Sequence, residues 1–196
     1  MPRNVEIKAR LDATTHDEML ARIIAFAGSC SDILDQIDTF YDNTTTGQRL
    51  KLRSINLEKI EVIQYARSDQ TGPKVSDFIV IPIMVAQYRQ LARALRRAYG
   101  VLANVKKTRK LWLYRNPEDP DGPITRIHLD QVDNLGLFLE LEVQLEEGEH
   151  TAEQGGQIAA HICDQLGINE GNLVKGAYVD LLMANEEPQV DFNLID

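Results

Sequence analysis

Cysteine and long apolar segments are both scarce in this sequence. The 196 residues include two cysteines, Cys30 and Cys163, which lie far apart and form no C-x-x-C motif. This predicts neither a disulfide framework nor a structural zinc site, and it fits a reducing compartment. No segment of about 18 consecutive apolar residues occurs, and the residues after Met1 include no apolar signal-peptide core. We therefore expect a cytoplasmic protein that has no secretion signal and no membrane span.

Acidic residues outnumber basic ones, but the two signs are distributed unevenly along the chain. The net charge is −9, which argues against a general nucleic-acid binder. Residues 1–126 contain 20 basic and 15 acidic residues, a net charge of +5, whereas residues 127–196 contain one basic and 15 acidic residues, a net charge of −14. No Pro/Gly/Ser-rich linker separates the two regions. The sequence predicts one domain over residues 1–184, followed by a flexible acidic tail over residues 185–196.

Alternating polar and apolar residues predict a protein rich in β-strands. The strands are expected at residues 3–11, 36–41, 49–54, 59–67, 76–81, 101–114, 125–132 and 137–145. On the strand expected at residues 101–114, Trp112 and Tyr114 lie on the opposite face from Lys107 and Arg109. We therefore expect the two aromatic residues to pack in the core under a helix.

Helical periodicity interrupts the strands at four places. Two helices are expected where a capping box opens the segment and a glycine closes it: Thr15 with Glu18 and Gly28, and Thr151 with Gln154 and Gly167. A third helix is expected over residues 82–99, with its arginines on a solvated face and Met84 facing inward. A last short helix is expected around Tyr178.

Most strands combine an apolar face with a charged one. For a single strand, solvation of the polar face is the simpler interpretation. Here, however, the faces carry runs of one sign, and two arginines about 6.7 Å apart repel by about 2.5 kcal/mol at an effective dielectric constant near 20. If the sheet curls into a barrel, these faces line a charged lumen with room for one small ligand. The alternating residues are Glu6 and Lys8; Arg49, Lys51 and Arg53; Lys107 and Arg109; Arg126, His128 and Asp130; Glu140 and Glu142.

These residue types are what triphosphate chemistry requires. Lysines and arginines clamp phosphate oxygens through charge-assisted hydrogen bonds, and clustered carboxylates hold a hard cation such as Mg²⁺ or Mn²⁺. The cation neutralises the charge that develops on phosphoryl oxygens. His128 shares the charged face, but we expect a lone histidine to be structural.

The segment Asn4-Val5-Glu6-Ile7-Lys8 resembles the N-terminal E-x-E-x-K signature of the CYTH superfamily, the triphosphate tunnel metalloenzymes. The similarity runs from Asn4 to about Leu182 and resembles the branch labelled class IV adenylyl cyclase-like; the superfamily also includes thiamine triphosphatases. The further matching segments are residues 36–41, 47–53, 64–69, 107–109, 125–130, 136–142 and 177–182.

The resemblance implies an α+β fold in which an eight-stranded antiparallel β-barrel, with helices packed outside, binds a triphosphate and one or two divalent ions. The catalytic residues that it implies are Lys8 and Glu6. The metal ligands that it implies are Glu6, Asp130, Glu140 and Glu142. The phosphate-binding residues that it implies are Lys8, Arg49, Lys51, Arg53, Arg67, Lys107, Arg109 and Arg126.

Two positions depart from the pattern of the superfamily. Asn4 stands where the first glutamate of the signature belongs, which removes one negative charge from the metal cluster. Lys175 is followed by Gly176, Ala177 and Tyr178 instead of Ser and Tyr, so we assign it no role.

The leading hypothesis is therefore a divalent-metal-dependent enzyme that cleaves a P–O bond of a triphosphate, as a class IV adenylate cyclase converts ATP to cyclic AMP and pyrophosphate. A triphosphatase that hydrolyses tripolyphosphate, a nucleoside triphosphate or thiamine triphosphate is the first alternative. The substitution at Asn4 motivates a second, a non-catalytic polyphosphate- or nucleotide-binding module, and an acidic protein-interaction domain is a third. The expected partner is a small-molecule triphosphate, with no nucleic acid and no membrane; the sequence is compatible with a homodimer.

Overall fold

The fold was obtained as a computed structural model, which describes residues 3–11, 14–42, 47–67, 72–146 and 148–185. The side chain of Arg67 lies outside the described part, although its backbone belongs to a strand. The acidic tail expected over residues 185–196 also lies outside the described residues, except for Asn185.

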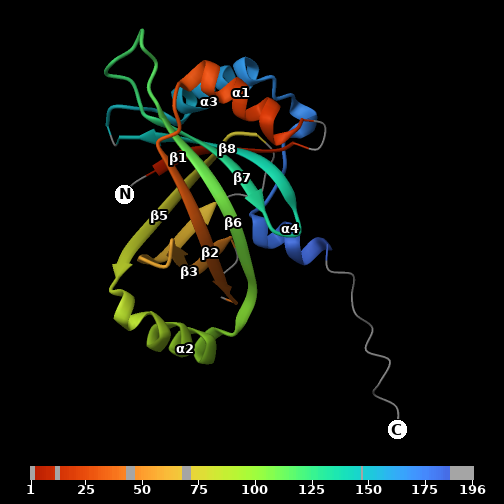
Figure 1. The fold of residues 1–196 in the computed structure, drawn as a ribbon. Helices are drawn as coiled ribbons and strands as arrows, with labels where there is room; N and C mark the ends of the chain where they lie inside the picture. Colours follow the sequence, from red (N-terminus) through yellow and green to blue (C-terminus); the bar gives the residue numbers. More distant parts are fainter. Residues whose placement is uncertain (1–2, 12–13, 43–46, 68–71, 147, 186–196) are drawn as a thin grey trace.

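The described residues form eight strands that close into an antiparallel barrel in the order β1-β5-β4-β3-β2-β6-β7-β8 (Figure 1). β1 closes the barrel because it pairs with β8 on one side and β5 on the other, so that Glu6 lies opposite both Glu142 and Lys74. This confirms the predicted α+β barrel. The strands are β1 (Arg3–Arg10), β2 (Asp32–Tyr41), β3 (Gln48–Ile55), β4 (Lys59–Arg67), β5 (Lys74–Ile83), β6 (Val101–Tyr114), β7 (Thr125–Val132) and β8 (Gly136–Leu145).

Helices lie outside the barrel, two between strands and two after the last strand, and both predicted capping boxes are present. Thr15 and Glu18 exchange hydrogen bonds at the start of α1, and Thr151 and Gln154 do so at the start of α3. Among the described residues, none of the helices combines the length and the apolar character needed to cross a membrane. The helices are α1 (His16–Ala27), α2 (Tyr88–Tyr99), α3 (Ala152–Leu166) and α4 (Tyr178–Asn185), with 3-10 turns at η1 (Val85–Gln87) and η2 (Glu170–Asn172).

The boundary between β5 and α2 was predicted wrongly. Helical periodicity placed the start of the helix at Pro82, but β5 runs to Ile83 and α2 begins at Tyr88. In the described registers Pro82 pairs with Glu61 of β4, while the pairing of β5 with β1 ends at Asp77. Proline is tolerated in a strand where one edge has no partner, because no amide donor is needed on that side. Met84 was expected to face inward and is instead 66% exposed.

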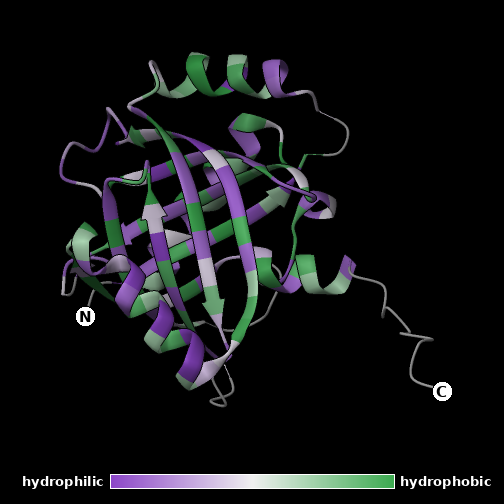
Figure 2. Cartoon of the chain, turned by 60° about the horizontal axis from the view of Figure 1, so that its bottom comes forward, coloured by the Kyte–Doolittle hydropathy of each residue, from purple (hydrophilic) through white to green (hydrophobic). Residues whose placement is uncertain are grey.

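The largest apolar core lies outside the barrel, beneath α1 and α3, which pack side by side (Figure 1). Trp112 is fully buried there and donates its indole N–H to the carbonyl oxygen of Gly28 at 3.1 Å, while Tyr114 stacks against Phe26 of α1. The predicted packing of Trp112 and Tyr114 under a helix is therefore confirmed. Hydrophilic and hydrophobic residues alternate along the strands (Figure 2), so the apolar face is outside and the polar face lines the interior.

Candidate functional site

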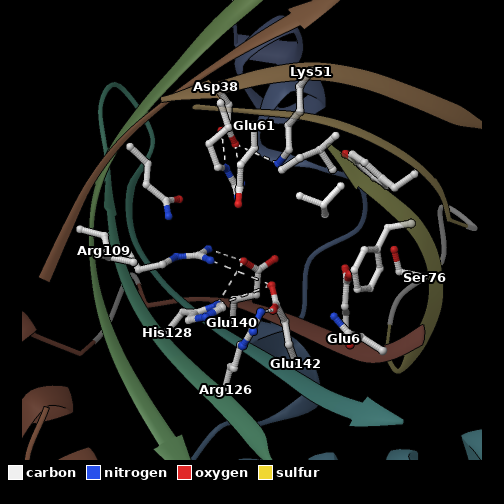
Figure 3. A pocket seen from close by; sticks show the side chains of 18 of the residues that line it. Glu6, Asp38, Lys51, Glu61, Ser76, Arg109, Arg126, His128, Glu140 and Glu142 are labelled. Carbon is white, nitrogen blue, oxygen red and sulfur yellow. Dashed lines mark hydrogen bonds and ion pairs between the residues drawn. The ribbon is translucent and has the colours of Figure 1, made fainter. Parts of the chain in front are cut away.

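A cavity of about 630 Å³ fills the barrel and is lined by residues from all eight strands and from α4 (Figure 3). Seven basic and five acidic side chains of the described residues line it, so the lumen has a positive balance in a chain whose net charge is −9. An excess of cations in a confined space favours an anionic ligand. The predicted site residues that line this cavity are Glu6, Lys8, Lys51, Arg53, Lys107, Arg109, Arg126, Glu140 and Glu142.

The carboxylate wall, which we define as Glu6, Lys8, Arg126, His128, Glu140 and Glu142, is contributed by β1, β8 and β7. The strand registers bring these side chains together, because Lys8 and His128 both lie opposite Glu140, and Glu6 and Arg126 both lie opposite Glu142. Glu140 accepts a hydrogen bond from Lys8 at 2.6 Å and another from Arg109 at 2.6 Å. Burial alone would raise the pKa of Glu140, but Lys8 and the neighbouring donors hold it well below its usual value.

Glu142 and His128 have looser surroundings than Glu140. The contacts of Glu142 with Arg126 and Arg109 are 3.8 and 4.0 Å long. Nδ1 of His128 is buried and has no hydrogen-bond partner among the described residues; it lies 3.7 Å from Oε1 of Glu142 and 3.8 Å from Oε2 of Glu140. Burial, and next the charge of Arg109, lower the pKa of His128. One ligand atom from each of the three residues lies within 4.8 Å of the other two, a spacing that suits a cation.

The opposite side of the lumen is the Asp38 wall, which we define as Asp38, Lys51 and Arg53 of β2 and β3 (Figure 3). Asp38 accepts two hydrogen bonds from Arg53, at 2.7 and 2.8 Å, and one from Lys51 at 3.0 Å. Burial would raise the pKa of Asp38, but Arg53 and then Lys51 hold it well below its usual value. Burial and the charge of Arg53 lower the pKa of Lys51 to about 7.

Between the two walls, β6 contributes Lys107 and Arg109. The buried carboxylate of Asp130 on β7 contacts both side chains and positions them. Asp130 is 0% exposed and accepts two hydrogen bonds from Arg109 and one from the hydroxyl of Tyr178 at 2.9 Å, with Lys107 at 3.3 Å. Burial and the charge of Arg109 lower the pKa of Lys107 to about 8. The carboxylate of Asp130 is therefore occupied by protein donors, and it does not line the cavity. Its role as a metal ligand stays a prediction, and the described contacts make it a positioning group.

Two of the predicted phosphate-binding residues, Arg49 and Arg67, are not among the described residues that line the cavity. The guanidinium of Arg49 donates a hydrogen bond to Asp180 of α4 at 2.8 Å, and Arg49 does not line the cavity. The side chain of Arg67 lies outside the described residues. Lys175 is exposed, whereas Asn4 is buried and lines the cavity.

The structure adds Asp38, Tyr178 and His128 to the residues that the sequence placed at the site. The signal for Asp38 was present, because it shares the inward parity of Gln36 on β2 and lies opposite Arg53. Tyr178 had no comparable local signal: it enters the wall from α4, with Nζ of Lys8 3.9 Å from the centre of its ring. His128 shares the parity of Arg126 and was expected to be structural; it lines the cavity, and its residue type alone gave no signal for a ligand role.

The donors of the carboxylate wall fit a divalent cation. Glu6, Glu140 and Glu142 offer the carboxylate oxygens that hard cations prefer, and the unpartnered Nδ1 of His128 points to the same place. The cations that line the rest of the lumen suit an oligoanion. The arrangement can therefore hold an anion together with its counter-cation.

Comparison with known proteins agrees with this geometry. The CYTH domain family matches residues 2–178. The chain belongs to the CYTH family. No curated protein resembles this CYTH chain closely enough in sequence to count as a match.

Solved structures show that the CYTH fold is shared. PH1012 from Pyrococcus horikoshii OT3 has a TM-score of 0.73 and 20% identity, over 91% of this chain and 98% of that one. A Vibrio parahaemolyticus protein described as a "putative adenylate cyclase" has a TM-score of 0.69 and 19% identity, over 92% and 97%. HpAC1 from Hippeastrum, described as a "putative adenylyl cyclase" with a dominant triphosphatase activity, has a TM-score of 0.67 and 11% identity, over 96% of this chain and 98% of that one. At these identities the likeness concerns the fold alone.

Proposed function

We propose that this CYTH protein is a divalent-metal-dependent enzyme that cleaves a P–O bond of a triphosphate inside the barrel. The observation that carries the proposal is the convergence of basic side chains from β1, β3, β6 and β7 on one cavity that also contains the carboxylate wall. Membership of the CYTH family supports it.

The described side chains would hold the phosphate chain by replacing their present contacts. Lys51 and Arg53 share the carboxylate of Asp38, and Lys8 and Arg109 share that of Glu140. Phosphate oxygens match the forked geometry of arginine and accept charge-assisted hydrogen bonds, so a triphosphate can occupy these donors without leaving them unpaired. Glu6, Glu140 and Glu142 would hold Mg²⁺ or Mn²⁺, which supplies charge neutralisation at the phosphoryl oxygens when bound.

Two reactions fit this site. In the adenylate cyclase reaction, the 3′-oxygen of ATP bonds to the α-phosphorus, the bond to the bridging oxygen breaks, and pyrophosphate leaves with release of the hydroxyl proton. In the triphosphatase reaction, the oxygen of water bonds to the terminal phosphorus, the bond from that phosphorus to the bridging oxygen breaks, and orthophosphate and the remaining diphosphate leave with release of a proton.

An apolar rim favours a substrate that carries an organic group. Leu34, Leu111 and Leu113 line one part of the cavity, and Leu113 is 53% exposed, which places it at the mouth. An apolar surface beside a cationic lumen suits the base of a nucleoside triphosphate or the thiamine group better than bare tripolyphosphate. This favours ATP cyclisation, or hydrolysis of an organic triphosphate, over hydrolysis of an inorganic one.

Products identify the reaction. The purified chain is incubated with Mg²⁺ or Mn²⁺ and with ATP, thiamine triphosphate or tripolyphosphate, and products are separated by anion-exchange chromatography. Cyclic AMP with pyrophosphate would identify the cyclase, and orthophosphate the triphosphatase. Glu142→Gln should abolish turnover, whereas Arg96→Ala on the exposed face of α2 should not change it.

Two results would contradict the proposed enzyme. Tight triphosphate binding without turnover in either metal would indicate the non-catalytic module. A melting temperature that tripolyphosphate leaves unchanged would exclude a triphosphate site, because ligand binding at a hundredfold excess over the dissociation constant stabilises a protein by about 2.7 kcal/mol.

A further inference from the structure

The imidazole of His128 lies beside Glu140 on the carboxylate wall, below Arg109 in the view of Figure 3. In the barrel His128 is flanked by Leu111 of β6 and by Glu140 of β8. It is 2% exposed, and within the part of the chain that the structure describes its Nδ1 has no hydrogen-bond partner. Buried polar atoms are nearly always paired, so an unpaired nitrogen that faces two carboxylates requires a physical reason.

The distances around Nδ1 leave room for an ion rather than for a hydrogen bond. Oε1 of Glu142 is 3.7 Å away and Oε2 of Glu140 is 3.8 Å away, both beyond hydrogen-bond range. Two donors that are each about 2.1 Å from one ion lie about 3 to 3.4 Å from one another. One ligand atom from each of His128, Glu140 and Glu142 lies within 4.8 Å of the other two, so small side-chain movements would bring all three atoms onto a single cation.

The carboxylates of Glu140 and Glu142 differ in how many oxygen lone pairs are available to coordinate such an ion. Both oxygens of Glu140 already accept a hydrogen bond, one from Lys8 and one from Arg109, but each oxygen has a second lone pair. Glu142 has contacts of 3.7 Å and longer with the described residues around it. Among His128, Glu140 and Glu142, the donors with the most free coordination capacity are therefore Glu142 and His128.

We propose that Nδ1 of His128 is a ligand of the metal ion in the barrel, together with Glu142 and Glu140. This inference rests on the proposed function, because it assigns a further ligand to the same metal centre. Imidazole suits borderline transition ions, whereas Mg²⁺ prefers oxygen ligands. A centre that contains His128 therefore selects Mn²⁺ over Mg²⁺.

The test is a spectroscopic one, with Mn²⁺ bound to the full chain in the absence and presence of tripolyphosphate. Electron spin-echo envelope modulation detects a ¹⁴N nucleus coordinated directly to Mn²⁺. The wild-type protein should show this coupling, and His128→Phe, which keeps a ring but has no donor, should lose it. His161→Phe is the matched control, because His161 is exposed on α3, and it should keep the coupling.

Affinity gives a second readout by isothermal titration calorimetry with each metal alone. His128→Phe should weaken Mn²⁺ binding by about tenfold or more and Mg²⁺ binding by less, which reduces the Mn²⁺ preference. His128→Asn, which restores a donor near the position of Nδ1, should recover part of the loss. The wild-type spectrum remains decisive if a variant fails to fold.

The outcomes separate this inference from the proposed function. Bound Mn²⁺ without a ¹⁴N coupling in the wild-type protein would overturn the role of His128, while the metal site and turnover would stand. If neither ion bound with or without tripolyphosphate, the proposed function would fail together with the inference.

Discussion

The Asp38 wall and the carboxylate wall are built from the same residue types but leave different groups satisfied. On the Asp38 wall a single carboxylate receives three hydrogen bonds at 2.7 to 3.0 Å from Arg53 and Lys51. On the carboxylate wall Glu140 is similarly occupied, whereas Glu142 and His128 have only contacts of 3.7 Å or longer. The Asp38 wall holds the charged ends of Lys51 and Arg53 in place before an anion binds. The carboxylate wall keeps the metal-ligating atoms of Glu142 and His128 available for a metal cation.

Arg109 lies between the two walls and pairs with Asp130 and with Glu140 of the carboxylate wall, and its loss should have the largest effect. Arg109→Met removes two hydrogen bonds from Asp130 and one from Glu140, both deeply buried. Removing one partner of a buried ion pair costs about 3 to 5 kcal/mol. We expect the free energy of unfolding to fall by about 3 kcal/mol, the lower end of this range, because Lys107 and Tyr178 still contact the carboxylate of Asp130. Urea unfolding measures the change, with the exposed Arg96→Met as control; an equal loss in both variants would contradict the positioning role of Asp130.

A pair of acid-to-amide variants sharpens the contrast between the walls. Asp38→Asn should lower the free energy of unfolding by about 2 kcal/mol, because Lys51 and Arg53 lose their shared carboxylate. Glu142→Gln should change stability by less, because its partners are more distant. Tripolyphosphate should raise the melting temperature of Asp38→Asn more than that of the wild type, since the anion replaces the missing charge. An equal loss of unfolding free energy in Asp38→Asn and Glu142→Gln would contradict the proposed difference between the two walls.

The smallest expected effect is a pH dependence of anion binding. Lys51 faces Asp38 of β2, Arg53 of β3 and Lys107 of β6, and burial with the charge of Arg53 lowers its pKa to about 7. At pH 8 Lys51 is therefore mostly neutral, and a bound triphosphate favours its protonation, so binding should take up as much as about one proton and weaken as pH rises from 7 to 9. Calorimetry in buffers of different ionisation enthalpy measures this uptake.

Lys51→Arg provides the control for this pH effect, because arginine stays protonated in the whole range. The variant should bind with less proton uptake and with a flatter pH profile. Identical uptake in Lys51→Arg and the wild type would assign the proton to another group.

Local patterns predicted most of the fold. Both capping boxes start helices where expected, and the inward parity of the charged residues holds on the strands around the lumen. The start of α2 was missed because a helical pattern cannot show that one edge of β5 lacks a partner near Pro82. Arg49 has the parity of Lys51, yet it pairs with Asp180 from a helix 131 positions away.

Within the site, parity identified the inward-facing charges but not their pairing. Asp130 lies on the face of Arg126 and His128, but its burial behind Arg109 depends on Tyr178 of α4. Asp38 and His128 became site residues only when β2 and β7 were placed opposite charged neighbours.

The alternation of residues along each strand by itself determined that this chain forms a sheet with one charged face, because successive side chains point to opposite sides. The tertiary structure alone decided which charges neutralise one another. Closure between β1 and β8 brings Lys8 next to Glu140 across 132 positions, and the pairing of β7 with β8 places Nδ1 of His128 near Glu140 and Glu142 without a hydrogen-bond partner among the described residues. Such pairings depend on barrel closure and on distances between strands far apart in sequence, which no local pattern encodes.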